Sequence, residues 1–235
     1  PSGNDWIASI AESVQNRLNR VPSAKMMPLN IADQLMGAAA GLEKTLMPDL
    51  QLLARQARYQ AHRQSAAYFL ELFHQTKDSS ALDRFDQEMK DAGKSFPGMD
   101  QRPADELIAV LRPTAQAAPA REIPALPKTI ARPQFTETPV RTAPSDQPLN
   151  ITLQLPPGKD AQTVRLHYRP IDRPGPSGVI EKAAASSVTF TIAPPDLPPS
   201  DLIYFFEILN RENSGWFEPD PAATTPYHVV RIEIK

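Results

Sequence analysis

Apolar side chains recur at helical spacing from Asp49 to Lys77, a 29-residue stretch that contains neither proline nor glycine. They form two stripes, one of Leu50, Leu53, Ala57, Ala61, Tyr68 and Leu72, and a rotated one of Leu52, Tyr59, His62, Ala66, Phe69 and Phe73. A helix with two apolar faces must be covered on two sides. The pattern therefore predicts a helix about 43 Å long in the middle of a helical bundle.

Four shorter segments share the helical period and complete a predicted all-α bundle over residues 1–111. They are Trp6–Asn19, Leu29–Met47, Ser79–Ala92 and Ala104–Leu111. Asn4 or Asp5 is a suitable cap for the first of them, and Ser79 or Ser80 for the one that follows the central helix. Gly93 predicts the end of that helix.

The composition changes near residue 112, because all six methionines precede it and 20 of the 26 prolines follow it. Proline is excluded from helix interiors but is tolerated in turns and at strand edges. Helices are therefore expected before this point and strands after it. The proline-rich residues 112–133 predict an extended, semi-rigid connector between two domains.

Beyond residue 133 the apolar positions alternate, most clearly from Val188 to Ile192. The predicted strands are Gln134–Val140, Leu149–Leu155, Thr163–Arg169, Gly178–Lys182, Ser187–Ile192, Leu202–Asn210 and Pro226–Ile234. Short alternating strands separated by proline-rich turns are typical of an antiparallel sandwich. The sequence predicts such a seven-stranded β-sandwich over residues 134–235.

Charge and composition narrow the function classes. The net charge of −2 and the pI near 6.1 give no electrostatic reason to expect binding to nucleic acid or to an anionic membrane. The absence of cysteine excludes disulfides, thiolate metal sites and cysteine nucleophiles. No apolar run approaches 18 residues, so no transmembrane span is predicted. Pro1 does not open a basic and then apolar leader, and the sequence lacks an initiator methionine, so we expect either a processed protein or a piece of a longer one, and we favour the piece.

The run Tyr204–Asn210, with residues 214–216 after it, resembles the sixth strand and following turn of a fibronectin type III or similar immunoglobulin-like module. In such modules a tyrosine near the start of that strand packs at a corner, and an Asn-to-Gly turn leads to the last strand. Tyr204, Asn210 and Gly215 match these roles. Because the chain has no cysteine, the resemblance is to the disulfide-free relatives.

A second resemblance rests on segments of the helical part: Pro28–Leu35, Asp49–Tyr59, Leu70–Phe73, Thr76–Asp78 and Ala81-Leu82. They are similar to the bundle that follows the catalytic barrel in some large bacterial glycoside hydrolases of the hexosaminidase and α-glucuronidase type. The barrel itself has no counterpart in this chain. The resemblance implies an accessory region whose partner is an upstream catalytic domain of the same polypeptide, in an extracellular or periplasmic location.

Two short motifs lack the context that their chemistry requires. Glu71-x-x-His74 has the spacing of a di-iron helix motif, but a second copy on a facing helix is missing. Gly93-Lys94-Ser95 matches the end of a phosphate-binding loop, but Glu88 occupies the position of its first glycine. We therefore predict neither a metal site nor a cofactor.

Other ionisable side chains are expected at the surface. Asp83, Asp86 and Glu88 are expected on the exposed face of a short helix, and His167 and His228 at the surface or at strand edges. Paired carboxylates hydrolyse glycosides only when a cleft holds them about 5–9.5 Å apart. We predict no catalytic residue in this chain.

The candidate ligand site is a late aromatic cluster of Trp216, Phe217 and Tyr227, with Asn213, Glu218 and Asp220 nearby. Sugar rings stack on exposed aromatic rings while polar neighbours bind their hydroxyl groups, so the cluster fits a carbohydrate platform. The same residues fit the sandwich core or an interdomain contact, because tryptophan usually buries most of its surface. Both interpretations stay open.

Three functions agree with the sequence. The first is a non-catalytic accessory region of a bacterial carbohydrate-active enzyme that supports the catalytic domain, binds polysaccharide, or does both. The second is a structural or protein-interaction module without glycan binding, and the third is a free-standing enzyme with a site at the domain junction. An exposed Trp216 favours the carbohydrate-active accessory region. A buried Trp216 with an apolar patch elsewhere favours the interaction module, and a deep polar cleft with perturbed acids favours the enzyme.

Overall fold

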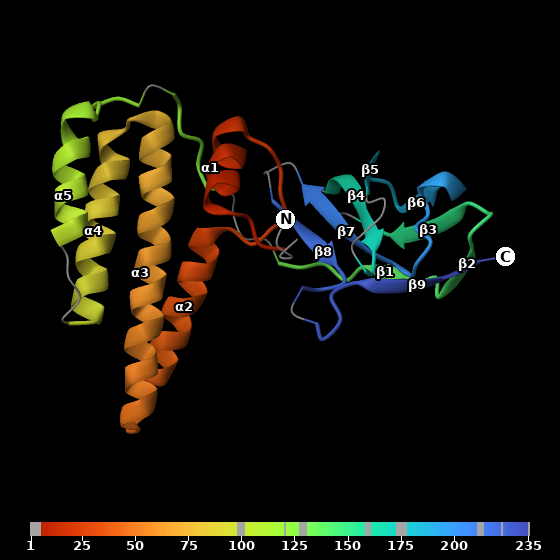
Figure 1. Cartoon of the computed structure of the whole chain (residues 1–235), viewed down its shortest axis with the longest axis horizontal. Coiled ribbons are helices and arrows are strands. Elements are labelled where there is room, and N and C mark those ends of the chain that lie inside the picture. Colours follow the sequence, from red (N-terminus) through yellow and green to blue (C-terminus); the bar gives the residue numbers. More distant parts are fainter. Residues whose placement is uncertain are drawn as a thin grey trace. The chain divides into compact units, whose positions relative to one another are not determined.

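The computed structural model describes residues 6–97, 102–119, 121–126, 131–157, 161–172, 178–210, 214–221 and 223–234. Within these residues the chain forms five α-helices and then a β region of two sheets (Figure 1). It divides into two compact units. The helical unit contains Pro1–Val21 and Met26–Leu126, and the β unit contains Pro22–Lys25 and Pro127–Lys235.

The helices of the helical unit are α1 (Ile10–Asn19), α2 (Pro28–Leu42), α3 (Pro48–Thr76), α4 (Ser79–Ser95) and α5 (Arg102–Leu111), followed by the short 3-10 helix η1 (Arg112–Thr114). The long helix α3 lies within one residue of its predicted bounds. In Figure 1, α2 runs beside the first half of α3, and α4 runs back beside its second half.

The first helix begins at Ile10 instead of Trp6, because the residues before it are extended. The N–H of Ala8 donates to the carbonyl oxygen of Met26 at 3.1 Å, which holds this segment in a bridge. The side chain of Ser9 then accepts the N–H three residues further on, also at 3.1 Å, and caps the helix. The caps expected at residues 4 and 5 lie outside the described part of the chain.

Helix α4 begins at Ser79 as predicted, but its cap and its end differ from the prediction. Its cap is Asp78, whose side chain accepts from the N–H of Ser80 at 3.1 Å. The helix passes through Gly93 and ends at Ser95, so Gly93 is not a stop signal here.

The helical core gathers around the second half of α3. Its buried members are Val14, Leu18, Ala66, Tyr68, Leu72, Phe73, Ala81, Leu82 and Phe85. The Tyr68 hydroxyl accepts from Arg17 Nη1 at 3.1 Å, so α1 is held to α3 by a polar contact as well as by packing. Residues 112–126, which the sequence places in the connector, belong to the helical unit, and Ala115 and Ile123 pack against its core.

The strands of the β unit are β1 (Thr136–Glu137), β2 (Thr142–Pro144), β3 (Leu149–Gln154), β4 (Ala161–Pro170), β5 (Gly178–Ala183), β6 (Ser187–Ile192), β7 (Leu202–Asn210), β8 (Gly215–Glu218) and β9 (His228–Glu233). One sheet has the order β1-β3-β6. The other has the order β2-β9-β7-β4-β5, and β8 pairs with β7 beside it. A short 3-10 helix, η2 (Pro194–Asp196), precedes β7.

The predicted sandwich of seven antiparallel strands is wrong in two respects. Strand β2 runs parallel to β9, with Thr142 opposite Arg231, so its sheet is mixed. The described residues contain nine strands, because β2 and β8 are additional and the predicted strand Gln134–Val140 shrinks to the two residues of β1. Strands of two to four residues are too short to show a clear alternation in the sequence.

The core of the β unit is formed by the inward-facing side chains of both sheets. It includes Leu149, Ile151, Leu153, Val164, Leu166, Val188, Phe190, Ile192, Leu202, Tyr204, Phe206, Ile208, Trp216, Val230 and Ile232. Strand β7 contributes every second residue to this core, yet all nine of its residues are buried. Its opposite face is therefore covered as well.

The left-handed backbone of Lys77, at the C-terminal cap of α3, leads to a testable prediction. Lys77 has a φ of 57°, a left-handed conformation that favours glycine, and its ammonium group lies 5.3 Å from the centre of the Phe73 ring. Lys77→Gly removes the backbone cost and Lys77→Ala keeps it, while both lose the ring contact. We expect the glycine variant to have the higher free energy of unfolding, by about 0.5–1 kcal/mol, in chemical unfolding followed by far-UV circular dichroism. Equal stability of the two variants would contradict this account.

Candidate functional site

The structure buries the two leading residues of the predicted carbohydrate platform. Trp216 and Phe217, on β8, are 8% and 3% exposed. The Trp216 ring packs in the core, and its centre lies 6.1 Å from that of the Phe135 ring. The Phe217 and Phe205 rings pack edge to face, with their centres 5.7 Å apart. This burial agrees with the alternative interpretation, core packing, since a stacking platform presents a ring face to solvent.

Three of the other predicted platform residues differ in their placement. Tyr227 is half-buried immediately before β9, and the Asp220 side chain is 49% exposed. Asn213 lies outside the described residues. The aromatic and polar members of the predicted site therefore do not form one open surface in the described part of the β unit.

Arg132 joins two of the acids of this region. Its guanidinium group forms an ion pair with Glu218, donates to the carbonyl oxygen of Phe217 and lies 3.5 Å from Asp220. The same group lies 5.4 Å from the centre of the Phe135 ring. Arg132 precedes the first strand in a proline-rich stretch, and no pattern in the sequence indicates this role.

A buried acid, Glu137 on β1, forms a second cluster with β7 and β9. The Glu137 side chain is 3% exposed, and its Oε2 lies 2.6 Å from Nε2 of His228. The Tyr204 hydroxyl donates to Oε1 of Glu137. Burial, together with the hydrogen bond to Glu137 and the charge of that carboxylate, raises the pKa of Tyr204. His228, expected at the surface or at an edge, instead pairs with a buried carboxylate, and its side chain is 18% exposed.

The two clusters interact electrostatically through their acids. Burial raises the pKa of Glu218, and the negative charge of Glu137 acts in the same direction. The positive charge of Arg132 opposes both effects, without cancelling them. Glu218 is thus an acid that the fold favours in its protonated form, relative to a free side chain.

A third cluster surrounds Glu207 in the middle of β7. Its Oε1 accepts from the N–H of Ala24 at 2.9 Å, and its Oε2 lies 3.0 Å from Nε2 of His167 and 3.3 Å from Nη1 of Arg165. The His167 ring stacks on Phe205, with centres 4.7 Å apart and planes within 4°. Burial alone raises the pKa of Glu207, but the hydrogen bonds from His167 and Ala24 and the positive charges beside them lower it overall.

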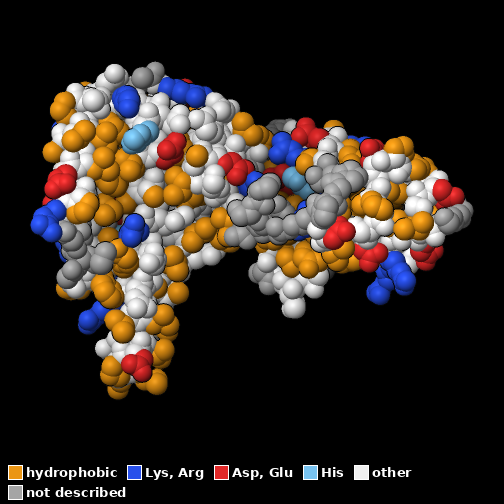
Figure 2. Space-filling model, in the orientation of Figure 1, with side chains coloured by type: hydrophobic (Ala, Val, Ile, Leu, Met, Phe, Trp, Pro, Cys, Tyr) orange, Lys and Arg blue, Asp and Glu red, His pale blue; other side chains and the backbone are white. Residues whose placement is uncertain are grey.

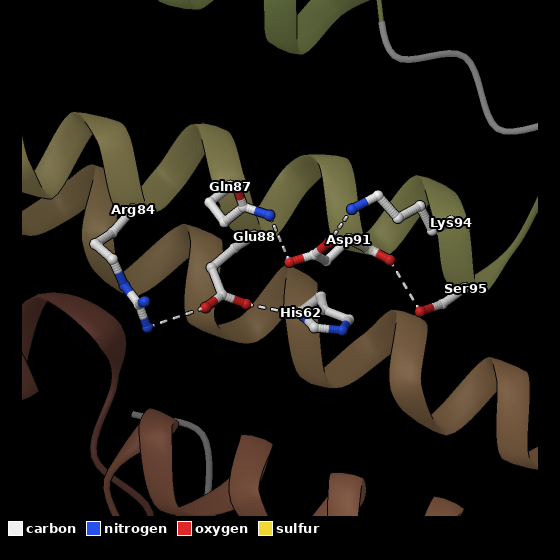
Figure 3. A network of polar contacts seen from close by, with 7 residues as sticks. All are labelled: His62, Arg84, Gln87, Glu88, Asp91, Lys94 and Ser95. Atoms are coloured by element: carbon white, nitrogen blue, oxygen red, sulfur yellow. Dashed lines mark hydrogen bonds and ion pairs between the residues drawn. The ribbon is translucent and has the colours of Figure 1, made fainter.

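In the helical unit, polar contacts link α3 to α4 (Figure 3). His62 Nδ1 lies 2.8 Å from Oε2 of Glu88, whose side chain is only 14% exposed, and Arg84 approaches the other oxygen at 3.4 Å. Glu88 was expected on an exposed face together with Asp83 and Asp86. It is half-buried instead, because its side chain faces α3 and pairs with His62.

The neighbouring acid in Figure 3, Asp91, is held by its own helix. A hydrogen bond from Gln87 and then one from Lys94 lower its pKa. Ser95, the last residue of α4, donates its hydroxyl to the Asp91 backbone oxygen at 2.9 Å. These contacts are of the kind that stabilise helices and helix pairs.

Exposed apolar side chains gather at the turn between α2 and α3. Leu46 and Met47 are 95% and 60% exposed, and Leu52 and Leu53 on the first turns of α3 are 47% and 49% exposed. Figure 2 shows hydrophobic side chains clustered over this end of the helical unit. We call these four residues the apolar turn. Exposed apolar patches of this kind are typical of protein contact surfaces.

The Glu71-x-x-His74 motif belongs to no metal-binding group among the described residues. Glu71 accepts from Gln75 at 2.9 Å, and His74 is exposed. Within the described ranges, no three His, Asp or Glu side chains are grouped as ligands of a metal ion would be. No helix in the part of the chain that the structure describes has the length and apolarity needed to cross a membrane. Comparison of the sequence with known protein families and with curated proteins gives no match.

The opposite pKa shifts of Glu207 and Glu218 predict opposite dependences on pH. The lowered pKa of Glu207 means that the folded state prefers the carboxylate, so this contribution to stability is lost as the pH falls below the ordinary value of 4.5. The raised pKa of Glu218 means that the folded state prefers the acid, so stability is gained as the pH falls through that raised value toward 4.5.

We therefore expect Glu207→Gln to lower the free energy of unfolding at neutral pH by about 1–3 kcal/mol and to reduce its loss in acid. Glu218→Gln should leave the neutral-pH value unchanged or slightly raised. Denaturant unfolding at a series of pH values, followed by Trp216 fluorescence in a Trp6→Phe background, measures both. Glu181→Gln is the control, because Glu181 also pairs with Arg165 but is 56% exposed. Parallel pH curves for all variants would contradict the assignment.

Proposed function

We propose that this chain is a non-catalytic accessory region of a bacterial carbohydrate-active enzyme, where it supports an upstream catalytic domain of the same polypeptide in the periplasm or outside the cell. The proposal that the chain is non-catalytic rests on one observation: its buried acids are paired with side chains and backbone groups of the same chain. Glu137 is held by Tyr204 and His228, and Glu207 is held by three donors from β4 and residue 24. Carboxylates used in this way hold strands together.

The strand order supports the immunoglobulin-like part of the proposal. In fibronectin type III and related modules one sheet contains strands A, B and E, and the other contains G, F and C with further edge strands. The order β1-β3-β6 matches the first sheet, and β9-β7-β4-β5 matches the second. Tyr204, at the third position of β7, lies where the resemblance expects a corner tyrosine.

The choice between the two roles of an accessory region depends on which surfaces are open. Trp216 is buried, whereas the apolar turn of the helical unit is exposed. This combination favours support through protein contact over polysaccharide stacking. The same combination favours the second candidate function, a structural or protein-interaction module without a carbohydrate-active parent.

Whether the chain belongs to a larger carbohydrate-active enzyme is tested with the native protein. Antibodies raised against this chain are used to isolate the polypeptide that carries it from the cells that make it. We expect a polypeptide larger than 25.9 kDa that hydrolyses glycosidic bonds in a panel of oligosaccharides. A native polypeptide of 25.9 kDa without hydrolase activity would overturn the accessory role and leave the interaction module.

Polysaccharide binding is tested separately with the isolated chain. We expect titration with soluble polysaccharides to produce neither saturable heat nor a change in Trp216 fluorescence, because both aromatic rings of β8 are occupied by packing. Saturable binding that is lost in Tyr227→Ala and in Asp220→Ala, but kept in Tyr59→Ala of the helical unit, would contradict this expectation and establish a glycan site beside β9.

A further inference from the structure

The first half of α3 is covered by helices on one side only. Helix α2 lies against it, with Arg58 paired to Glu43 and Gln51 donating to the carbonyl oxygen of Thr45 at 3.0 Å. Helix α4 ends at Ser95, and the beginning of α3 extends beyond it (Figure 1). A face of α3 that the sequence predicts to be covered therefore stays open.

This open face forms a groove of about 480 Å³. Its walls are Leu35 from α2, Leu53, Ala57 and Tyr59 from α3, and Phe96 beyond the end of α4. Gln56 and Gln60 also line it. The Tyr59 and Phe96 rings lie 6.0 Å apart and close one end of it. A groove with apolar walls along a helix fits another helix.

The stripe of α3 that lines the groove carries opposite charges at its two ends. Asp49, Leu53, Gln56, Gln60 and Arg63 recur at spacings of four and three, so they lie along one stripe of α3. The acid is at one end and the base is 14 residues further on, which is about 21 Å along the helix. These two charges are too far apart to pair within one chain.

A second α3 placed antiparallel, with Gln56 opposite Gln56 of the other copy, brings the oppositely charged ends of the two stripes together. Asp49 then faces Arg63 of the other copy, and this pair occurs twice because the arrangement has two-fold symmetry. Leu53 meets Tyr59 of the other copy, and the two central amides can bond to each other. The Arg63 guanidinium group already lies 5.7 Å from the centre of the Tyr59 ring, which holds it at the edge of the groove.

We infer that this face of α3 pairs with the same face of a second copy of this chain, so that two α2–α3 hairpins form a four-helix arrangement. Antiparallel packing of two helical hairpins is an established way to build a helical bundle. The contact is confined to about four turns of helix, so it is smaller than a standard stable interface, and we expect a concentration-dependent dimer. The inference does not depend on the proposed catalytic domain.

Charge reversal tests the arrangement in the full chain. Asp49→Arg gives a stripe with a base at both ends, and Arg63→Asp gives one with an acid at both ends. Each variant alone places like charges opposite each other twice, so self-association should weaken by about tenfold or more. An equal mixture of the two variants restores both ion pairs, and so does the double variant Asp49→Arg/Arg63→Asp. Both should recover dimerisation.

Sedimentation velocity across a range of concentrations measures the dimer, and far-UV circular dichroism checks that each variant is folded. Leu53→Glu should also abolish association, whereas Val110→Glu, at a site 71% exposed on α5, is the matched control and should not. Recovery in the mixture supports the inference, because a folding defect in either variant would persist there. A wild-type chain that stays monomeric at every concentration, or a dimer unchanged by the single reversals, would overturn it.

Discussion

Burial of β7 on both faces is the constraint on which the β unit depends. Its inward residues fill the core between the sheets, and its outward residues, Ile203, Phe205, Glu207 and Leu209, are buried as well. An acid in the middle of such a strand is costly unless it is fully hydrogen-bonded. Glu207 therefore determines what can lie around it: a histidine and an arginine on β4, and a backbone N–H from Ala24. Through that last bond a segment of the N-terminal part of the chain becomes part of the β unit.

On the inner face of β7, a second acid contacts Tyr204. Tyr204 has a buried hydroxyl that needs an acceptor, and Glu137 supplies it from β1 while also approaching His228 on β9. Strands that share no hydrogen-bonded ladder with each other are thus connected by side chains. These polar contacts connect β1 to β7 and to β9.

Helical periodicity was sufficient to predict the five helices, because α3 and its neighbours keep their apolar stripes over several turns. The long apolar run Leu202–Asn210 predicted β7 at its observed bounds. The parallel pair of β2 and β9 could not be predicted, because a three-residue strand carries no period. Partners of the buried acids are 40 residues apart for His167 and Glu207 and more distant for Glu137 and His228, and no local pattern records such contacts. One signal was present: Glu207 interrupts an otherwise apolar run, and a buried acid requires a cationic or hydrogen-bonding partner.

The same physical argument separates structure from recognition in this chain. A sugar-binding aromatic side chain must leave one ring face open, and Trp216 cannot do so while it fills the β core beside Phe135. Residues that the β unit needs for its stability are thereby removed from ligand binding. The helical unit has the opposite property, because α3 is longer than the helices that cover it and its first turns expose leucines that lie outside the core formed by the described residues. Apolar surface of this kind is stabilised only when something covers it. We therefore propose that recognition belongs to the helices, whereas the buried charges of the β unit maintain strand pairing.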